Sequence, residues 1–77
     1  MQGKIKIQIK NVYGTEKAYP VDTSAELFAR IAGTKTLARH VLSKVLEMGL
    51  SIEVVDRYGN VSATFRASDE SRLPAVM

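Results

Sequence analysis

The sequence contains no cysteine and no tryptophan, and its only histidine is His40. The absence of cysteine excludes disulfide bonds, zinc sites built from thiolates and a thiol nucleophile. A single histidine argues against a metal site built from imidazoles. A chain of 77 residues forms one small domain with a thin margin of stability. Such domains often rely on disulfides, a metal or self-association, so a homodimer is one of the states that we expect.

Long apolar runs and a strong charge imbalance are also absent. No stretch is long enough to span a membrane, and Met1-Gln2-Gly3-Lys4 leads into alternating lysine and isoleucine rather than into the apolar segment of a signal peptide. We therefore expect a cytoplasmic protein, in a bacterial cell or in a cell that hosts a virus. The net charge of +3 is compatible with nucleic-acid binding, although Lys and Arg form no dense cluster.

Four segments have the pattern of β-strands. The first alternates strictly, with isoleucines on one face and mostly lysines on the other. Residues 11–14 suit a type I turn that closes a first hairpin, and residues 56–59 suit a second turn of the same kind. The two turns have similar sequences, which common turn chemistry also explains. The predicted strands span residues 4–10, 16–19, 51–55 and 61–66.

Two helices are expected between the hairpins. Thr23 and Glu26 have the spacing of a capping box at the start of the first helix, and Gly33 is a natural residue to end it. The second helix spans about residues 37–48, with Thr36 as its N-cap. Apolar positions recur at helical spacing in both segments, so each helix has one face for a core.

These elements predict an α+β fold in which two β-hairpins bracket an αα-hairpin, in the order ββααββ. The simplest packing is an antiparallel sheet with the helices on one face. Residues 1–66 would form a single domain. Residues 67–77, rich in serine and charge, are predicted to be a flexible C-terminal tail.

The sequence offers no catalytic constellation. His40 lies on the polar side of the second predicted helix with no nucleophile beside it. The carboxylates are scattered, and Asp22, Glu26 and Asp56 are explained by helix and turn chemistry. Phosphate-binding loops, dinucleotide motifs and calcium loops are missing. We therefore expect a protein that is not an enzyme, has no catalytic residues, and carries neither a cofactor nor a metal.

Lysines of the first strand form one candidate binding surface. Lys4, Lys6 and Lys10 share its polar face, and lysines two residues apart lie about 6–7 Å apart along a strand, a spacing at which they can meet phosphates. Solubilising lysines on an outer sheet face are equally ordinary, and on an edge strand they block unwanted pairing.

The helix pair forms a second candidate surface. Ala29 and Gly33 have the A-x-x-x-G spacing found at the end of the first helix in many helix-turn-helix motifs. The second helix would then be the recognition helix, with its N-terminal end on phosphates and its polar face on base edges. An αα-hairpin packed on a sheet is the plainer alternative. The nucleic-acid contacts predicted here are Lys35, Arg39, His40, Ser43 and Lys44.

Three tyrosines lie at or near turns and form a third candidate surface. Tyr13, Tyr19 and Tyr58, with Arg57 beside the last, are predicted to contact a protein partner. Tyrosine buries a large area at low entropic cost, so exposed tyrosines often anchor interfaces. Packing of each ring over its own strands is the alternative.

Two resemblances extend these patterns. Val12-Tyr13-Gly14, Tyr19-Pro20 and the segment from Phe28 to Leu37 resemble short uncharacterised proteins of bacteriophages and other mobile elements, over about residues 4–55. From Leu37 onward, the order of helix, strand, turn and strand resembles the outline of the Cro repressor. That resemblance implies DNA contacts from the second helix and a dimerising hairpin over residues 52–66. The basic hairpin upstream departs from the Cro pattern.

Two function classes follow. The first is a small DNA-binding protein of phage or mobile-element origin, helix-turn-helix-like in part. The second is a viral accessory protein that binds and blocks a host protein, such as a nuclease or a host-defence complex. The basic charge argues against DNA mimicry but not against steric occlusion. The sequence favours nucleic acid, with a host protein as the alternative partner. A structural or virion role comes third.

Overall fold

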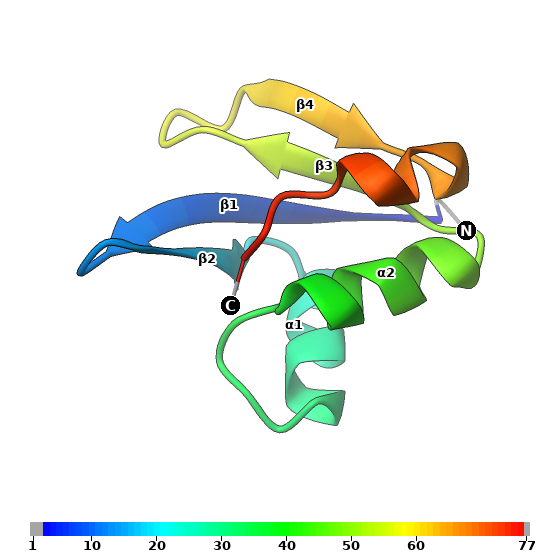
Figure 1. Ribbon diagram of the computed structural model, residues 1–77, viewed down its shortest axis with the longest axis horizontal. Helices are drawn as coiled ribbons and strands as arrows, with labels where there is room; N and C mark the ends of the chain where they lie inside the picture. Colours follow the sequence, from blue (N-terminus) through cyan, green and yellow to red (C-terminus); the bar gives the residue numbers. More distant parts are fainter. Residues whose placement is uncertain (1–2, 77) are drawn as a thin grey trace.

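The computed structural model describes residues 3–76. The strands form one sheet in the order β2-β1-β3-β4, with the helices packed against one face (Figure 1). This confirms the predicted α+β class. No described helix has the length and apolar character needed to cross a membrane. The elements are β1 (Lys4–Val12), β2 (Thr15–Pro20), α1 (Thr23–Ile31), α2 (Arg39–Glu47), β3 (Ser51–Val55), β4 (Val61–Phe65) and the 3-10 helix η1 (Ala67–Arg72).

The sheet is mixed, so the prediction of a purely antiparallel sheet was wrong. Both hairpins are antiparallel, but β1 and β3 pair in parallel at the centre. The connection through two helices is long enough to return the chain to the end of the sheet where β1 starts. There β3 completes the apolar face, because Ile52 lies beside Ile5 and Val54 beside Ile7.

The first hairpin turns more tightly than predicted. Val12 pairs with Thr15, so the loop contains only Tyr13 and Gly14. Both have positive φ, 54° for Tyr13 and 82° for Gly14, as in the two-residue turns whose twist matches that of a hairpin. The side-chain oxygen of Asn11 accepts a hydrogen bond from Gly14 N at 2.9 Å. The predicted four-residue turn over 11–14 is thus replaced by a two-residue turn.

The second hairpin has the turn that the sequence predicted. Gly59 N donates to the Asp56 carbonyl at 3.0 Å, and the Asp56 carboxylate accepts from the backbone N–H of Tyr58 and Asn60 at 2.8 and 3.0 Å. Gly59 has φ of 84°, which glycine adopts without steric cost. Because β1 and β3 run in parallel, the two hairpin turns lie at the same end of the sheet (Figure 1).

Neither helix starts as predicted: α1 has a different N-cap, and α2 begins two residues later. Asp22 is the N-cap of α1, and its carboxylate accepts from Ala25 N at 2.8 Å, in place of the Thr23 capping box. The second helix begins at Arg39 rather than at residue 37. Leu37 lies in the preceding linker, where its N–H donates to the Ala18 carbonyl at 2.8 Å and its side chain is fully buried. This tertiary contact holds Leu37 outside the helix.

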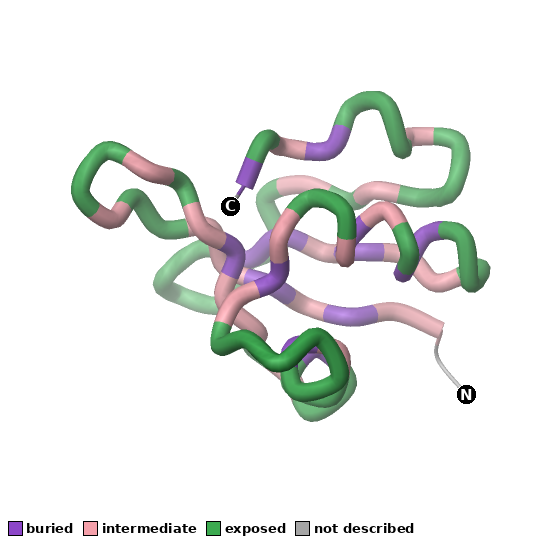
Figure 2. Tube along the Cα trace, turned by 60° about the horizontal axis from the view of Figure 1, so that its bottom comes forward, coloured by how far each residue is buried: buried purple, intermediate pink, exposed green. Residues whose placement is uncertain are grey.

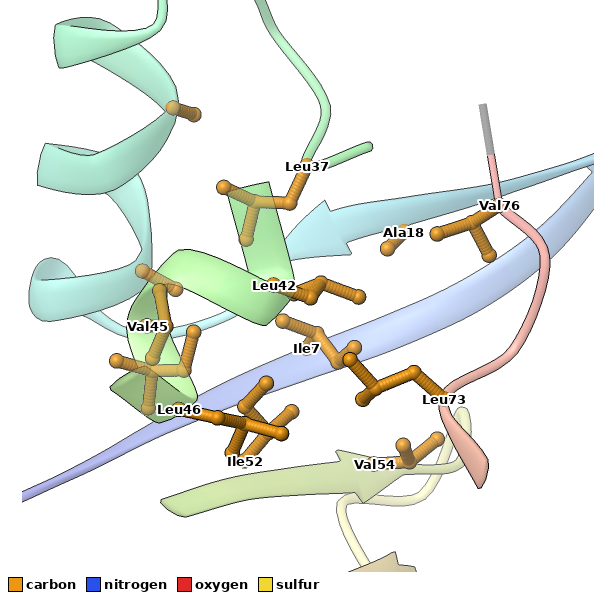
Figure 3. Close-up of a cluster of buried hydrophobic side chains, with 13 residues drawn as sticks. Ile7, Ala18, Leu37, Leu42, Val45, Leu46, Ile52, Val54, Leu73 and Val76 are labelled. Carbon is orange, nitrogen blue, oxygen red and sulfur yellow. The ribbon is translucent and has the colours of Figure 1, made fainter. Parts of the chain in front are cut away.

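One apolar core lies between the sheet and the helices (Figure 3). The strands contribute inward-facing isoleucines, a valine and an alanine, α1 contributes two alanines, and α2 contributes two leucines and a valine. Buried residues occur in the first half of β1, in β2 and β3, and on the inner side of α2, whereas no residue of β4 is buried; buried positions are purple in Figure 2. The buried residues of this core are Ile5, Ile7, Ala18, Ala25, Ala29, Leu37, Leu42, Val45, Leu46, Ile52, Val54, Leu73 and Val76.

The C-terminal segment also belongs to this core, which differs from the flexible tail that we predicted. Leu73 and Val76 are 6% and 4% exposed, and they lie over Ile7, Val54 and Ala18 (Figure 3). Arg39 N donates to the Val76 carbonyl at 3.1 Å. Two apolar residues therefore fix the segment beside α2, whereas its polar composition alone indicated a tail. Met77 of the predicted tail lies outside the described residues.

Candidate functional site

The face of the sheet turned away from the helices, here called the outer face, carries most of the predicted lysine surface. Residues alternate between the two faces of a strand. Since Ile5 and Ile7 of β1 and Ala18 of β2 are buried against the helices, their neighbours point outward. The outward residues of β1 and β2 include Lys4, Lys6, Gln8, Lys10, Lys17 and Tyr19.

A pair of like charges lies on this face near the turn of the first hairpin, between β1 and the edge strand β2. Lys10 of β1 is directly opposite Lys17 of β2. Two like charges in this position destabilise a sheet, by an amount on the order of 0.2–1 kcal/mol. The Nζ atom of Lys10 lies 5.2 Å from the centre of the Tyr19 ring, a cation–π contact that holds the lysine beside an aromatic surface. Positive charge and an aromatic ring are therefore combined at one place.

Little negative charge compensates the outer face. Glu53 of β3 forms an ion pair with Lys4, at 3.7 Å between Nζ and Oε2. Within residues 3–76, no carboxylate lies within ion-pair distance of Lys6, Lys10 or Lys17. Glu53 is also the register neighbour of Lys6. Lys10 and Lys17 therefore carry most of the excess positive charge that is available to an anionic ligand.

The hairpin turns extend this surface at one end of the sheet. Tyr13 is 102% exposed and Tyr58 is 79% exposed, so neither ring packs back over its strands. The Arg57 guanidinium carbon lies 6.0 Å from the centre of the Tyr58 ring. A cleft of about 510 Å³ separates the two hairpins. Its lining residues are Gln8, Ile9, Lys10, Asn11, Val55, Asp56 and Arg57.

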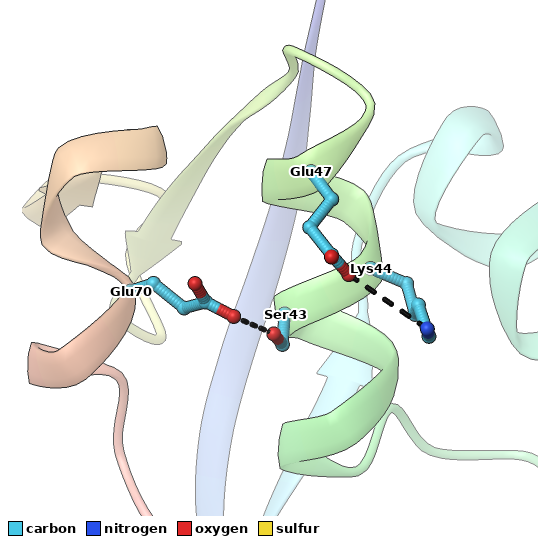
Figure 4. Close-up of polar contacts among 4 residues, drawn as sticks. All are labelled: Ser43, Lys44, Glu47 and Glu70. Carbon is cyan, nitrogen blue, oxygen red and sulfur yellow. Dashed lines mark hydrogen bonds and ion pairs between the residues drawn. The ribbon is translucent and has the colours of Figure 1, made fainter.

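The predicted contacts on α2 lie on the other side of the molecule, where two of them have a carboxylate partner (Figure 4). The Ser43 hydroxyl donates to the Glu70 carboxylate of η1. Lys44 pairs with Glu47, at 3.8 Å between Nζ and Oε2. Arg39 and His40 line a hollow of about 550 Å³ that Glu70 also lines. A phosphate approaching this face of α2 would therefore meet Glu70 and Glu47 together with Arg39, which has no ion-pair partner within residues 3–76.

The structure thus divides the predicted nucleic-acid contacts between two opposite sides. Lys4, Lys6 and Lys10 belong to the outer face, together with Tyr19 from the predicted protein interface. Lys35 lies in the exposed linker between the helices. A single straight nucleic acid cannot contact both sides at once.

Lys17 and Gln8 are site residues that the sequence did not single out. Both lie on the outer face through the register of the first hairpin, in which Gln8 faces Tyr19 and Lys10 faces Lys17. The signal was present in the short return strand, where Lys17 and Tyr19 alternate with buried Ala18. This alternation alone does not show that Lys17 faces Lys10. That pairing follows from the two-residue turn, because the turn sets which residues of the two strands face each other.

No family model matches the sequence, and neither a curated protein nor a solved structure matches the chain. Among residues 3–76, no three histidine, aspartate or glutamate side chains converge as a metal site would require. The candidate site therefore rests on geometry and charge alone.

Proposed function

We propose that this protein binds nucleic acid, without catalysing a reaction, through the outer face of its sheet. The observation that carries the proposal is the group of uncompensated lysines, with Lys10 directly opposite Lys17 and packed on Tyr19. Phosphates would relieve the repulsion between these two lysines, and a base can stack on the tyrosine ring. Bound nucleic acid thereby removes the destabilisation that the Lys10–Lys17 pair causes in the free protein.

Single-stranded DNA or RNA fits this face better than a duplex does. Its unstacked bases are free to lie on an aromatic ring while Lys side chains track the backbone. Duplex recognition by α2 would place phosphates beside Glu70 and Glu47, which hold Ser43 and Lys44. The proposal therefore keeps nucleic acid as the ligand and moves the contact from the helix to the sheet.

The test is fluorescence anisotropy with labelled single-stranded DNA, single-stranded RNA and duplex DNA of equal length, titrated over a range of salt. If three lysines contact phosphates, log K should fall with log[salt] with a slope of about −2 for single strands. Lys10→Ala and Lys17→Ala should each weaken binding and reduce the slope by about 0.7. Tyr19→Leu keeps apolar bulk but removes the ring, and should cost about 1–3 kcal/mol of binding free energy.

Matched controls come from the opposite side of the molecule. Lys35→Ala and Lys44→Ala remove the same charge from the linker and from α2, so we expect affinity close to that of the original protein. Binding that is lost in these controls but kept in Lys10→Ala and Lys17→Ala would reverse the assignment in favour of α2. Affinity that is undetectable, or independent of salt, would refute nucleic-acid binding.

A host protein is the second candidate partner, and the hairpin end is its proposed contact. The supporting observation is Tyr13, fully exposed in a left-handed conformation that tyrosine rarely adopts. The test is a pull-down from bacterial lysate with and without nuclease treatment. A partner that survives nuclease and is lost with Tyr13→Asn or Tyr58→Asn, but not with Lys17→Ala, supports this candidate. The phage or mobile-element origin stays a prediction from the resemblance.

A further inference from the structure

An apolar groove lies between α1 and the C-terminal end of α2, away from the outer face. Three large apolar side chains are exposed there: Leu27 by 52%, Ile31 by 79% and Met48 by 66%. Two adjoining hollows of about 410 and 380 Å³ share Phe28, Ile31 and Met48 in their walls. Contiguous exposed apolar surface of this kind marks an interaction site.

The charges around the groove are balanced. Lys4 lines one hollow and pairs with Glu53 at 3.7 Å, and Lys44 lines the other and pairs with Glu47 at 3.8 Å. Each lysine on the rim therefore has a carboxylate beside it. The rim therefore offers no unpaired lysine to attract a nucleic acid. It also has no excess charge that would attract a strongly acidic or strongly basic protein surface.

We propose that the groove binds a second copy of this chain. In a two-fold symmetric contact the same patch lies on both sides, so residue i meets residue j and residue j meets residue i. The rim suits this arrangement, because Lys44 of one copy can meet Glu47 of the other in both directions; these side chains are 76% and 59% exposed. The chain has a net charge of +3, but the charges at the rim are paired, so two copies repel each other little at the contact itself.

The shape of the groove also favours a symmetric contact between two copies. Leu27 and Ile31 are four residues apart on α1 and therefore form a ridge on one side of the helix. The hollows lie beside that ridge, between α1 and Met48. In a symmetric pair, the ridge of each copy enters the groove of the other.

The size of the contact sets the affinity range to search. A standard interface covers about 800 Å² on each partner, which would be roughly 15% of the chain's surface of 5211 Å². Three exposed and a few half-buried side chains place this contact at the small end. We therefore expect a reversible dimer that forms between micromolar and millimolar concentrations, with a melting temperature that rises with protein concentration.

The test is sedimentation equilibrium of the full chain at concentrations from about 1 µM to about 1 mM, because small interfaces have dissociation constants in this range. Ile31→Lys should shift the dissociation constant at least about tenfold toward monomer, since it places a charge in the apolar contact. The variant should fold, because Ile31 is 79% exposed and a basic residue suits the last turn of a helix. Circular dichroism checks this.

Thr64→Lys, on the exposed surface of β4, is the matched control. It adds the same charge to the hairpin that the Cro outline would use for dimerisation, and we expect the dimer to persist. A chain that is monomeric at 1 mM would overturn the proposal. A dimer lost with Thr64→Lys and kept with Ile31→Lys would also overturn it.

The absence of cysteine allows an independent check by cross-linking. Ile31→Cys introduces the only thiol of the chain, and oxidation should give a covalent dimer faster than it does with Thr64→Cys. Because a disulfide needs the two Cα atoms within about 7 Å, equal rates for the two variants would contradict a contact that places Ile31 close to the two-fold axis. This inference does not depend on nucleic-acid binding, because Leu27, Ile31 and Met48 lie on the helix side while Lys10, Lys17 and Tyr19 lie on the outer face; Lys4 lies at the border of the two.

Discussion

Replacement of Tyr13 by asparagine should stabilise this protein, although it removes a large aromatic side chain. Tyr13 has φ of 54° in the two-residue turn, and a side chain with a Cβ atom pays roughly 1–2 kcal/mol in that left-handed region. Asparagine tolerates the conformation, and Asn-Gly is the preferred sequence for this turn. The Tyr13 ring is 102% exposed, so no packing is lost when it is removed.

The expected gain is about 1 kcal/mol in the free energy of unfolding. For a domain of this size, that gain corresponds to a rise of about 4–8 °C in melting temperature. Tyr13→Gly should gain less, because glycine increases the entropy of the unfolded chain by an equivalent of about 0.4–1 kcal/mol. The order of stability should therefore be Asn, then Gly, then the original Tyr.

Thermal and urea unfolding, followed by circular dichroism, measure this directly at a fixed protein concentration. Tyr58→Asn is the control, since Tyr58 is also exposed but does not have positive φ; its effect should stay within about 0.5 kcal/mol. An unchanged or lower melting temperature for Tyr13→Asn would refute the reasoning. If the variant is more stable but binds a partner less well, the strained tyrosine serves binding rather than folding.

Two further predictions test the packing of the C-terminal segment and the cap of α1. Leu73→Ala should lower the free energy of unfolding by about 2–4 kcal/mol, because Leu73 fills a buried position in the core. Ala75→Ser, at an exposed position nearby, is the control. If urea unfolding gives equally small effects for both variants, the C-terminal segment is not packed in the core. Asp22→Ala should cost about 1 kcal/mol by removing the bond to Ala25 N. Thr23→Ala should cost less, and the reverse order in thermal melts would restore the predicted Thr23 cap.

Much of the fold could be predicted because local patterns and tertiary packing agree there. The alternating isoleucines of β1 predicted both the strand and its buried face, and Ile5 and Ile7 are fully buried. The limits of β3 matched those expected, because Gly49 ends α2 and the turn at Asp56 ends the strand. In each case, the chemistry of a few neighbouring residues decides the outcome.

Other features depend on contacts between distant residues. Leu37 follows a good N-cap residue and is apolar, which predicted helix, but its bond to Ala18 places it in an extended linker. Leu73 and Val76 stand in a polar segment, and only the space beside α2 makes them core residues. Glu70 is an ordinary surface carboxylate until η1 brings it to Ser43 of α2. Local patterns carry no information about such neighbours.

The candidate site shows the same division. The sequence alone determined which residue types were available: lysines without matching acids on β1, tyrosines near both turns, and neither cysteine nor a second histidine. The tertiary structure decided which of them act together. The two-residue turn set Lys10 opposite Lys17, and the parallel pairing of β1 with β3 brought both hairpin turns to one end. Strand register and direction arise from long-range pairing, because a strand pattern states which face is apolar but not which strand lies beside it.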